Sequence, residues 1–145
     1  MINIIKSRGT MKDSTEILEE LFDKGITTHD FKIANKYHIS IKNISSQDYV
    51  SIDENLSKIK KTVIGYTQEY ILERISKVLV KINDTLFISS EDAKNYLLAQ
   101  SASFSNKILT EHKKFEEAIK KALELDEIEE NFFDRADSLK KQERP

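Results

Sequence analysis

The stretch Phe31-Lys32-Ile33-Ala34-Asn35-Lys36-Tyr37-His38-Ile39-Ser40-Ile41-Lys42 decides the fold. Apolar and polar residues alternate on both sides of its centre, which is the pattern of two strands joined by a turn. A two-residue loop would set Ile33 opposite His38 and mix the two faces. A three-residue loop at residues 34–36 instead pairs Ile33 with Tyr37 and Phe31 with Ile39 on one face. We therefore expect a β-hairpin over about residues 31–42 with a three-residue loop.

A helix is expected before this hairpin. Asp13 and Glu16 have the spacing of a capping box, and Gly25 can adopt the left-handed conformation that ends a helix. Apolar residues between them repeat at helical spacing, at Ile17, Leu18, Leu21 and Phe22. The sequence therefore predicts a short helix over about residues 14–24.

Further helices are expected after the hairpin. Ser45 and Asp48 start one that ends before Gly65, and Ser89 with Asp92 starts another. Between them, residues 67–82 have the strongest amphipathic pattern in the chain. We expect Ile75, Val78, Leu79 and Ile82 of that helix to form the central core contact, against the hairpin and a stripe of Tyr49, Ile52 and Leu56.

The last helical stretch contains a predicted interruption. Ser101, Ser103 and Ser105 compete for backbone hydrogen bonds, which favours a kink or a break. Helical periodicity then resumes at Phe104, Ile108, Phe115, Ile119 and Ala122, with Glu116 to Lys120 and Glu117 to Lys121 as favourable i, i+4 pairs. The expected architecture is α+β and mostly α, a small N-terminal β-hairpin followed by a bundle of about four to five helices. Residues 1–133 form a single domain in this interpretation, and residues 134–145 a flexible C-terminal tail.

Composition narrows the functional classes. The chain has 145 residues, 3 Gly, 1 Pro, no Cys and a formal net charge of −2. Without cysteine there is no disulfide, thiolate metal site or cysteine nucleophile. No apolar run is long enough to cross a membrane, so we expect a soluble protein. The charge balance gives no bulk attraction to nucleic acid.

Sequence motifs for catalysis are absent. There is no phosphate-binding glycine loop and no nucleophile elbow, and the histidines His29, His38 and His112 are too far apart for a local metal pair. His112 lies between Ile108 and Phe115 on an apolar stripe, where a structural histidine is the better interpretation. We expect no enzymatic activity, no cofactor and no metal, although a small hydrolase or metal enzyme using His112 with neighbouring carboxylates is one alternative.

A second alternative is a small nucleic-acid-binding regulatory protein. Its support is a set of cations at helical spacing, namely Arg74, Lys77 and Lys81. No aromatic residues are interleaved with them, and no recognition-helix signature is present. We therefore interpret them as solvated residues opposite an apolar stripe.

The segment Leu125–Phe133 is the candidate partner-binding element. Its apolar residues are Leu125, Ile128, Phe132 and Phe133, and five acidic residues flank them, namely Asp126, Glu127, Glu129, Glu130 and Asp134. A helix of this kind docks into an apolar groove through anchors at i, i+3 and i+7, while its acidic rim steers it towards a basic partner. The alternative is that the same stripe packs on the protein's own core.

The order of elements resembles that of the tail assembly chaperones and baseplate hub proteins of tailed bacteriophages. Three stretches carry the likeness: the hairpin with the following Asn43-Ile44-Ser45-Ser46-Gln47-Asp48-Tyr49, the run from Leu72 to Phe87, and the closing Glu130-Asn131-Phe132. In the second stretch, Asp84 stands where the family has glycine.

This resemblance implies a non-enzymatic role in building a phage tail or baseplate, either as a structural hub subunit or as a chaperone. The implied partners are other tail or baseplate proteins, such as the hub or tape-measure protein. The implied location is the host cytoplasm during assembly, and the virion for a structural subunit.

Overall fold

The computed structural model describes residues 12–142, with side chains through Glu130. Within them are five helices, α2 (Ser14–Lys24), α3 (Ser46–Leu56), α4 (Tyr66–Val78), α5 (Ser90–Leu98) and α6 (Ala102–Gln142). Four strands form one antiparallel sheet in the order β1-β2-β3-β4, with β1 at Thr28–Ile33, β2 at Tyr37–Lys42, β3 at Leu79–Ile82 and β4 at Thr85–Leu86. The expected α+β, mostly α class is confirmed.

The hairpin of β1 and β2 has the register that side-chain parity predicts. Ile33 pairs with Tyr37, and Phe31 pairs with Ile39, across a three-residue loop. Ala34 and Asn35 in that loop both have positive φ values, of 55° and 54°. The sheet therefore has an apolar face, and its opposite face carries polar side chains that include Asp30, Lys32 and His38.

The helix predicted over residues 67–82 is wrong in its last turn. α4 ends at Val78, and Leu79–Ile82 is instead strand β3, which pairs with β2 through Ile41 and Ile39. Leu79 and Ile82 are spaced three residues apart, as on one helix face, and both are buried on β3 because its register with β2 shifts between Ser40 and Ile41. Val80 and Ile82 are β-branched, which favours a strand. Pairing with β2 satisfies the backbone groups that a hairpin alone would leave open.

Local capping signals place the helix starts. Asp13 accepts a hydrogen bond from the Glu16 backbone N–H, and Ser45 and Asp48 form a complete capping box. Ser89 accepts from the Asp92 backbone N–H, again as predicted. The helix that starts at Ser45 ends before Gly65, as predicted: α3 stops at Leu56, and a loop connects it to α4.

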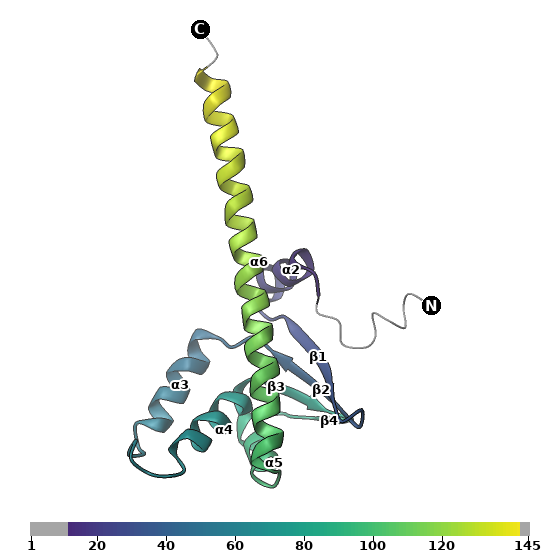
Figure 1. The fold of residues 1–145 in the computed structure, drawn as a ribbon, viewed down its shortest axis with the longest axis vertical. Coiled ribbons are helices and arrows are strands. Elements are labelled where there is room, and N and C mark those ends of the chain that lie inside the picture. The colour runs from purple at the N-terminus through teal and green to yellow at the C-terminus, as the bar shows by residue number, and fades with distance from the viewer. Residues whose placement is uncertain (1–11, 143–145) are drawn as a thin grey trace.

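The long helix α6 organises the molecule. It has 41 residues, so it is about 60 Å long at 1.5 Å per residue. The predicted interruption lies before it, where α5 ends at Leu98 and Ser101 accepts a hydrogen bond from the Phe104 N–H. Figure 1 shows the first half of α6 lying across the sheet beside α2, while the second half projects away from every other element. α6 continues to Gln142, so residues 134–142 are helical where the sequence predicted a tail.

The core lies between the apolar face of the sheet and α6. Ile75, Val78, Leu79 and Ile82 are all buried, as predicted. Aromatic contacts join the layers, because His29 stacks on Phe115 with ring centroids 5.4 Å apart. The predicted α3 stripe is only partly correct, since Ile52 and Leu56 are buried but Tyr49 is 52% exposed.

Candidate interaction surface

The projecting part of α6 is the most conspicuous surface of the protein. On this helix, Ile108, His112, Phe115, Ile119 and Ala122 are buried. From Leu123 to Glu130 no side chain is buried. The core contact of α6 therefore ends at Ala122, and the helix continues beyond it with no buried side chain among the described residues.

Two of the four predicted partner-binding residues have described side chains. Leu125 is 52% exposed and Ile128 is 62% exposed. Phe132 and Phe133 have helical backbone within α6, but their side chains lie outside the described residues. The structure thus brings all four positions onto one helix, and the first two are not buried in the protein's own core.

Charge along this helix changes sign. Residues 113–121 contain four lysines and two glutamates, whereas residues 124–130 contain five acidic residues and no basic residue. Acidic residues at i, i+3 and i, i+4, such as Asp126 with Glu129 and Glu130, weaken an isolated helix by roughly 0.2–0.5 kcal/mol per pair. A cationic partner surface would relieve this repulsion.

One of the predicted i, i+4 pairs on α6 is replaced by other contacts. Glu116 accepts a hydrogen bond from the Ile44 backbone N–H at 2.8 Å, and its carboxylate lies 3.3 Å from Nε2 of His112. It therefore ties α6 to the end of the hairpin, rather than bridging to Lys120 on the helix surface.

The buried histidines are part of the core. His112 has no exposed surface, and its Nε2 lies 3.0 Å from the Lys42 carbonyl oxygen. His29 is 5% exposed and lies 3.9 Å from Glu111, and burial lowers its pKa despite the neighbouring carboxylates of Glu111 and Asp30. Full burial and the contact with the Lys42 carbonyl oxygen agree with the interpretation of His112 as a structural histidine. No cluster of three or more metal-ligating side chains occurs in the described part of the chain.

A second charged cluster joins α3, α4 and α5. Lys94 pairs with Glu69 and Glu73, and Glu73 also accepts a hydrogen bond from the Asn55 side chain at 2.9 Å. Burial by itself would raise the pKa of Glu73, but the hydrogen bonds from Lys94 and Asn55 outweigh it and lower that pKa. The cluster therefore fastens three helices together.

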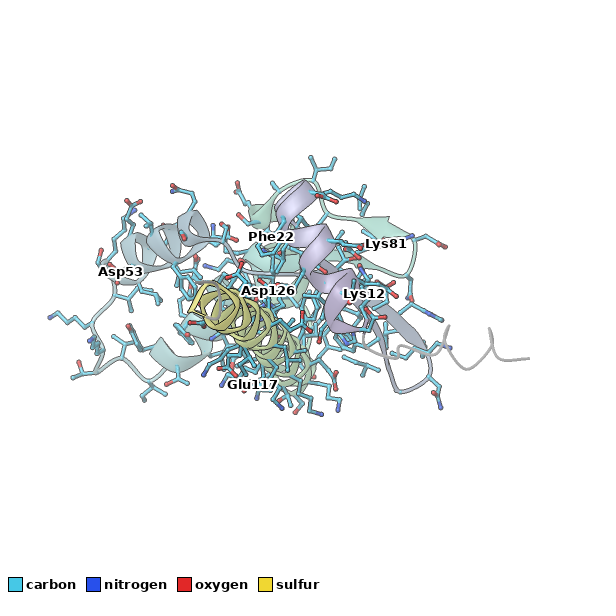
Figure 2. All side chains as sticks on the ribbon, turned by 90° about the horizontal axis from the view of Figure 1, so that it is seen from above. Lys12, Phe22, Asp53, Lys81, Glu117 and Asp126 are labelled. Atoms are coloured by element: carbon cyan, nitrogen blue, oxygen red, sulfur yellow. The ribbon has the colours of Figure 1, made fainter. Side chains whose placement is uncertain are left out.

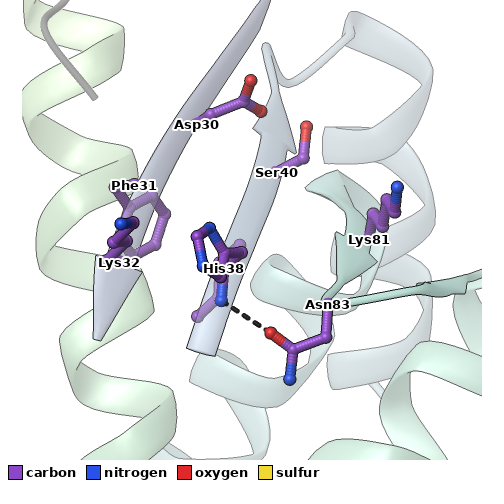
Figure 3. Close-up of a pocket in the computed structure, with 8 residues that line it drawn as sticks. Asp30, Phe31, Lys32, His38, Ser40, Lys81 and Asn83 are labelled. Atoms are coloured by element: carbon purple, nitrogen blue, oxygen red, sulfur yellow. Dashed lines mark hydrogen bonds between the residues drawn. The ribbon is translucent and has the colours of Figure 1, made fainter. Parts of the chain in front are cut away.

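The exposed face of the sheet holds a shallow depression of about 400 Å³. Its polar lining includes Asp30, Lys32, His38, Lys81 and Asn83 (Figure 3). The Asn83 side chain accepts a hydrogen bond from the His38 backbone N–H at 2.8 Å, which anchors the β3–β4 turn to β2. The depression is open and is lined by side chains of both charges, so it does not indicate one class of ligand.

The cation set behind the nucleic-acid alternative does not form one helical face. Arg74 is half-buried on α4 and donates to the Tyr70 hydroxyl at 3.2 Å. Lys77 donates to Ser90 at 3.2 Å, and Lys81 lies on strand β3. The single helical face that the nucleic-acid alternative needed is therefore not formed, because it required the helix to continue to Ile82. Our interpretation of these residues as solvated holds for Lys81, which is exposed, but Arg74 and Lys77 are half-buried.

Comparison with known protein families, curated proteins and solved structures found no match. Within the described residues, no helix combines the length and the apolar character that a membrane crossing needs.

Proposed function

We propose that this is a non-enzymatic assembly protein that acts by docking the projecting half of α6 onto another protein. The observation that carries the proposal is the end of core packing at Ala122, followed by exposed Leu125 and Ile128 on the same helix. From Leu123 to Glu130 no side chain is buried, so this part of α6 lacks the tertiary packing that supplies most helix stability, and its like charges weaken it further. A partner with an apolar groove and a basic rim supplies what the helix lacks.

The partners that we propose are proteins of a bacteriophage tail or baseplate, the hub or tape-measure protein first. The support is the resemblance in the order of elements to tail assembly chaperones and baseplate hub proteins. Whether the protein is a structural subunit or a chaperone is decided by mass spectrometry of purified virions. A subunit stays in the particle, and a chaperone leaves it.

Co-purification with the hub or tape-measure protein tests the docking proposal. Replacing Leu125 and Ile128 by Asp places charges on the docking stripe, so we expect the complex to be lost. Ile64→Asp is the matched control, because Ile64 is fully exposed in the loop between α3 and α4. Unchanged co-purification of the Leu125→Asp/Ile128→Asp variant would overturn the proposal, provided that its melting temperature matches that of wild type.

A further inference from the structure

A second stripe begins on α6 beside the core stripe. Lys114, Ala118, Lys121, Leu125 and Ile128 follow one another at steps of four, three, four and three residues, and we name this set the free seam. At 100° per residue they span an arc of about 80°, centred roughly 120° away from the core stripe. Alternating steps of three and four are the spacing with which one helix packs along another.

We call residues 12–122 the head. Most of the free seam is exposed on it and beyond it, at Lys114, Lys121, Leu125 and Ile128, whereas Ala118 is half-buried at the edge of the core. Around Ala118 lies a shallow hollow of about 480 Å³, lined by Lys113, Lys114, Glu117, Ala118 and Lys121. In the view along α6, Glu117 lies on the side of the helix that faces away from α2 and α3 (Figure 2). Ala118 is small and flanked by long side chains, so the hollow has room for a large side chain from another helix.

The charges select the direction in which such a helix runs. A parallel, in-register pair of α6 helices would oppose the two acidic stretches at residues 124–130. In an antiparallel pair centred on Leu125, Glu129 and Glu130 of each copy instead lie opposite Lys121 and Lys120 of the other, and only Glu124 and Asp126 still lie opposite acidic residues. Opposite charges across a helix pair set the orientation of the two chains.

We propose that the free seam pairs with the free seam of a second copy, as an antiparallel two-fold dimer centred on Leu125. This inference rests on the proposed docking function and adds a second copy of the chain as a further partner of the same helix. In this register Lys121 of each copy lies beside Glu129 of the other, and position 132 of each copy lies opposite Ala118 of the other. The two heads then lie at opposite ends of the paired helices.

Charge reversal tests the pairing in the full chain. Lys121→Glu alone sets two carboxylates against each other at positions 121 and 129, and Glu129→Lys alone sets two ammonium groups against each other there. Each variant should therefore weaken the dimer about tenfold or more. In an equimolar mixture of the two variants, a dimer with one chain of each kind again has opposite charges at both positions.

The proposed register explains why mixing the two variants should restore the dimer. In a mixed dimer, one site joins the two introduced side chains, glutamate at position 121 and lysine at position 129, and the other joins the native Glu129 of the first chain to the native Lys121 of the second. Both sites then hold opposite charges, so the mixture should dimerise as wild type does. Sedimentation velocity measures this against the 16.8 kDa monomer mass. A wild type that stays monomeric at about 100 µM, or a mixture that stays monomeric, would overturn the dimer.

Single cysteines test the direction, because the chain has none of its own. Leu125→Cys lies at the two-fold axis and should form a disulfide-linked dimer on mild oxidation. Ala118→Cys should not, because the two copies of residue 118 are about 20 Å apart along the axis at 1.5 Å per residue. Cross-linking of both variants to the same extent would show a parallel pair and overturn the antiparallel arrangement.

Failure of the dimer is distinct from failure of the proposed function. A monomeric wild type that still co-purifies with a hub or tape-measure protein removes only the second copy as partner. A dimer whose Leu125→Asp/Ile128→Asp variant still co-purifies removes only the docking role. Lys121→Glu retains both apolar anchors, so it shows whether that docking needs the dimer.

Discussion

At the scale of single residues, backbone conformation decides where elements end. Gly25 closes α2 with φ of 72° and donates its backbone N–H to the Leu21 carbonyl oxygen. A β-carbon there meets no atom within 4 Å, so the only cost of alanine is the left-handed conformation itself. Gly65 precedes α4 with φ of −80° and is equally open.

Gly25→Ala should therefore destabilise the protein by about 1 kcal/mol. Gly65→Ala is its matched control and should change the free energy of unfolding by less than about 0.5 kcal/mol, or raise it slightly. Urea denaturation measures both. Equal effects of the two substitutions would mean that the backbone conformation at Gly25 does not limit stability.

His29 makes stability depend on pH. Burial between Phe31 and Phe115 lowers its folded-state pKa below the ordinary value of 6.5, so the unfolded chain takes up a proton more readily than the folded protein does. Stability is therefore present above the unfolded pKa and is lost as the pH falls through about 6.5 towards the folded value. Glu20 and Glu73, whose pKa values are also lowered, act in a separate window below their ordinary value of 4.5.

His29→Phe keeps the ring stack and removes the titrating group. Thermal melts between about pH 7 and pH 5 should show a smaller loss of stability for this variant than for wild type. His38→Gln is the control, because it removes a second histidine of the sheet that is exposed on β2 rather than buried. An unchanged slope in His29→Phe would show that another group causes the loss.

At the scale of elements, strand parity was sufficient for β1 and β2. Each of the two possible loops sets a different residue opposite Ile33, so the pattern of Phe31, Ile33, Tyr37 and Ile39 admits only one register with a common apolar face. Strand β3 could not be predicted in the same way. Leu79 and Ile82 continue the helical spacing of Ile75 without a Gly or Pro between, and only pairing with β2 distinguishes the two states.

Leu79 tests that pairing energetically. It is 5% exposed on β3 and lies opposite Ile41. Leu79→Ala should cost about 2–5 kcal/mol, the usual range for truncating a buried leucine. Leu86→Ala on β4 is the control, since Leu86 is 63% exposed, and should cost about 0.5 kcal/mol or less. A small effect at Leu79, measured by chemical denaturation, would place β3 outside the cooperative core.

At the scale of the whole molecule, α6 continues past the end of the packed head at Ala122. Leu125 and Ile128 could be proposed as candidate anchors from their spacing among acidic neighbours. That they lie outside the core could not be predicted, because the same spacing also fits a stripe that packs on the protein's own core. The structure distinguishes the two cases, because core packing ends at Ala122 and both residues are exposed. The free seam was missed because lysines occupy two of its positions.

The most direct measurement is a melting curve of the chain truncated after Glu124. Residues beyond this point contribute no buried side chain in the described part of the chain, so the shortened protein should melt within about 2 °C of wild type at a concentration where both are monomeric. It should at the same time fail to join a hub or tape-measure complex. A large drop in melting temperature would contradict the account, because it would show that the segment from Leu125 onward belongs to the core of the head.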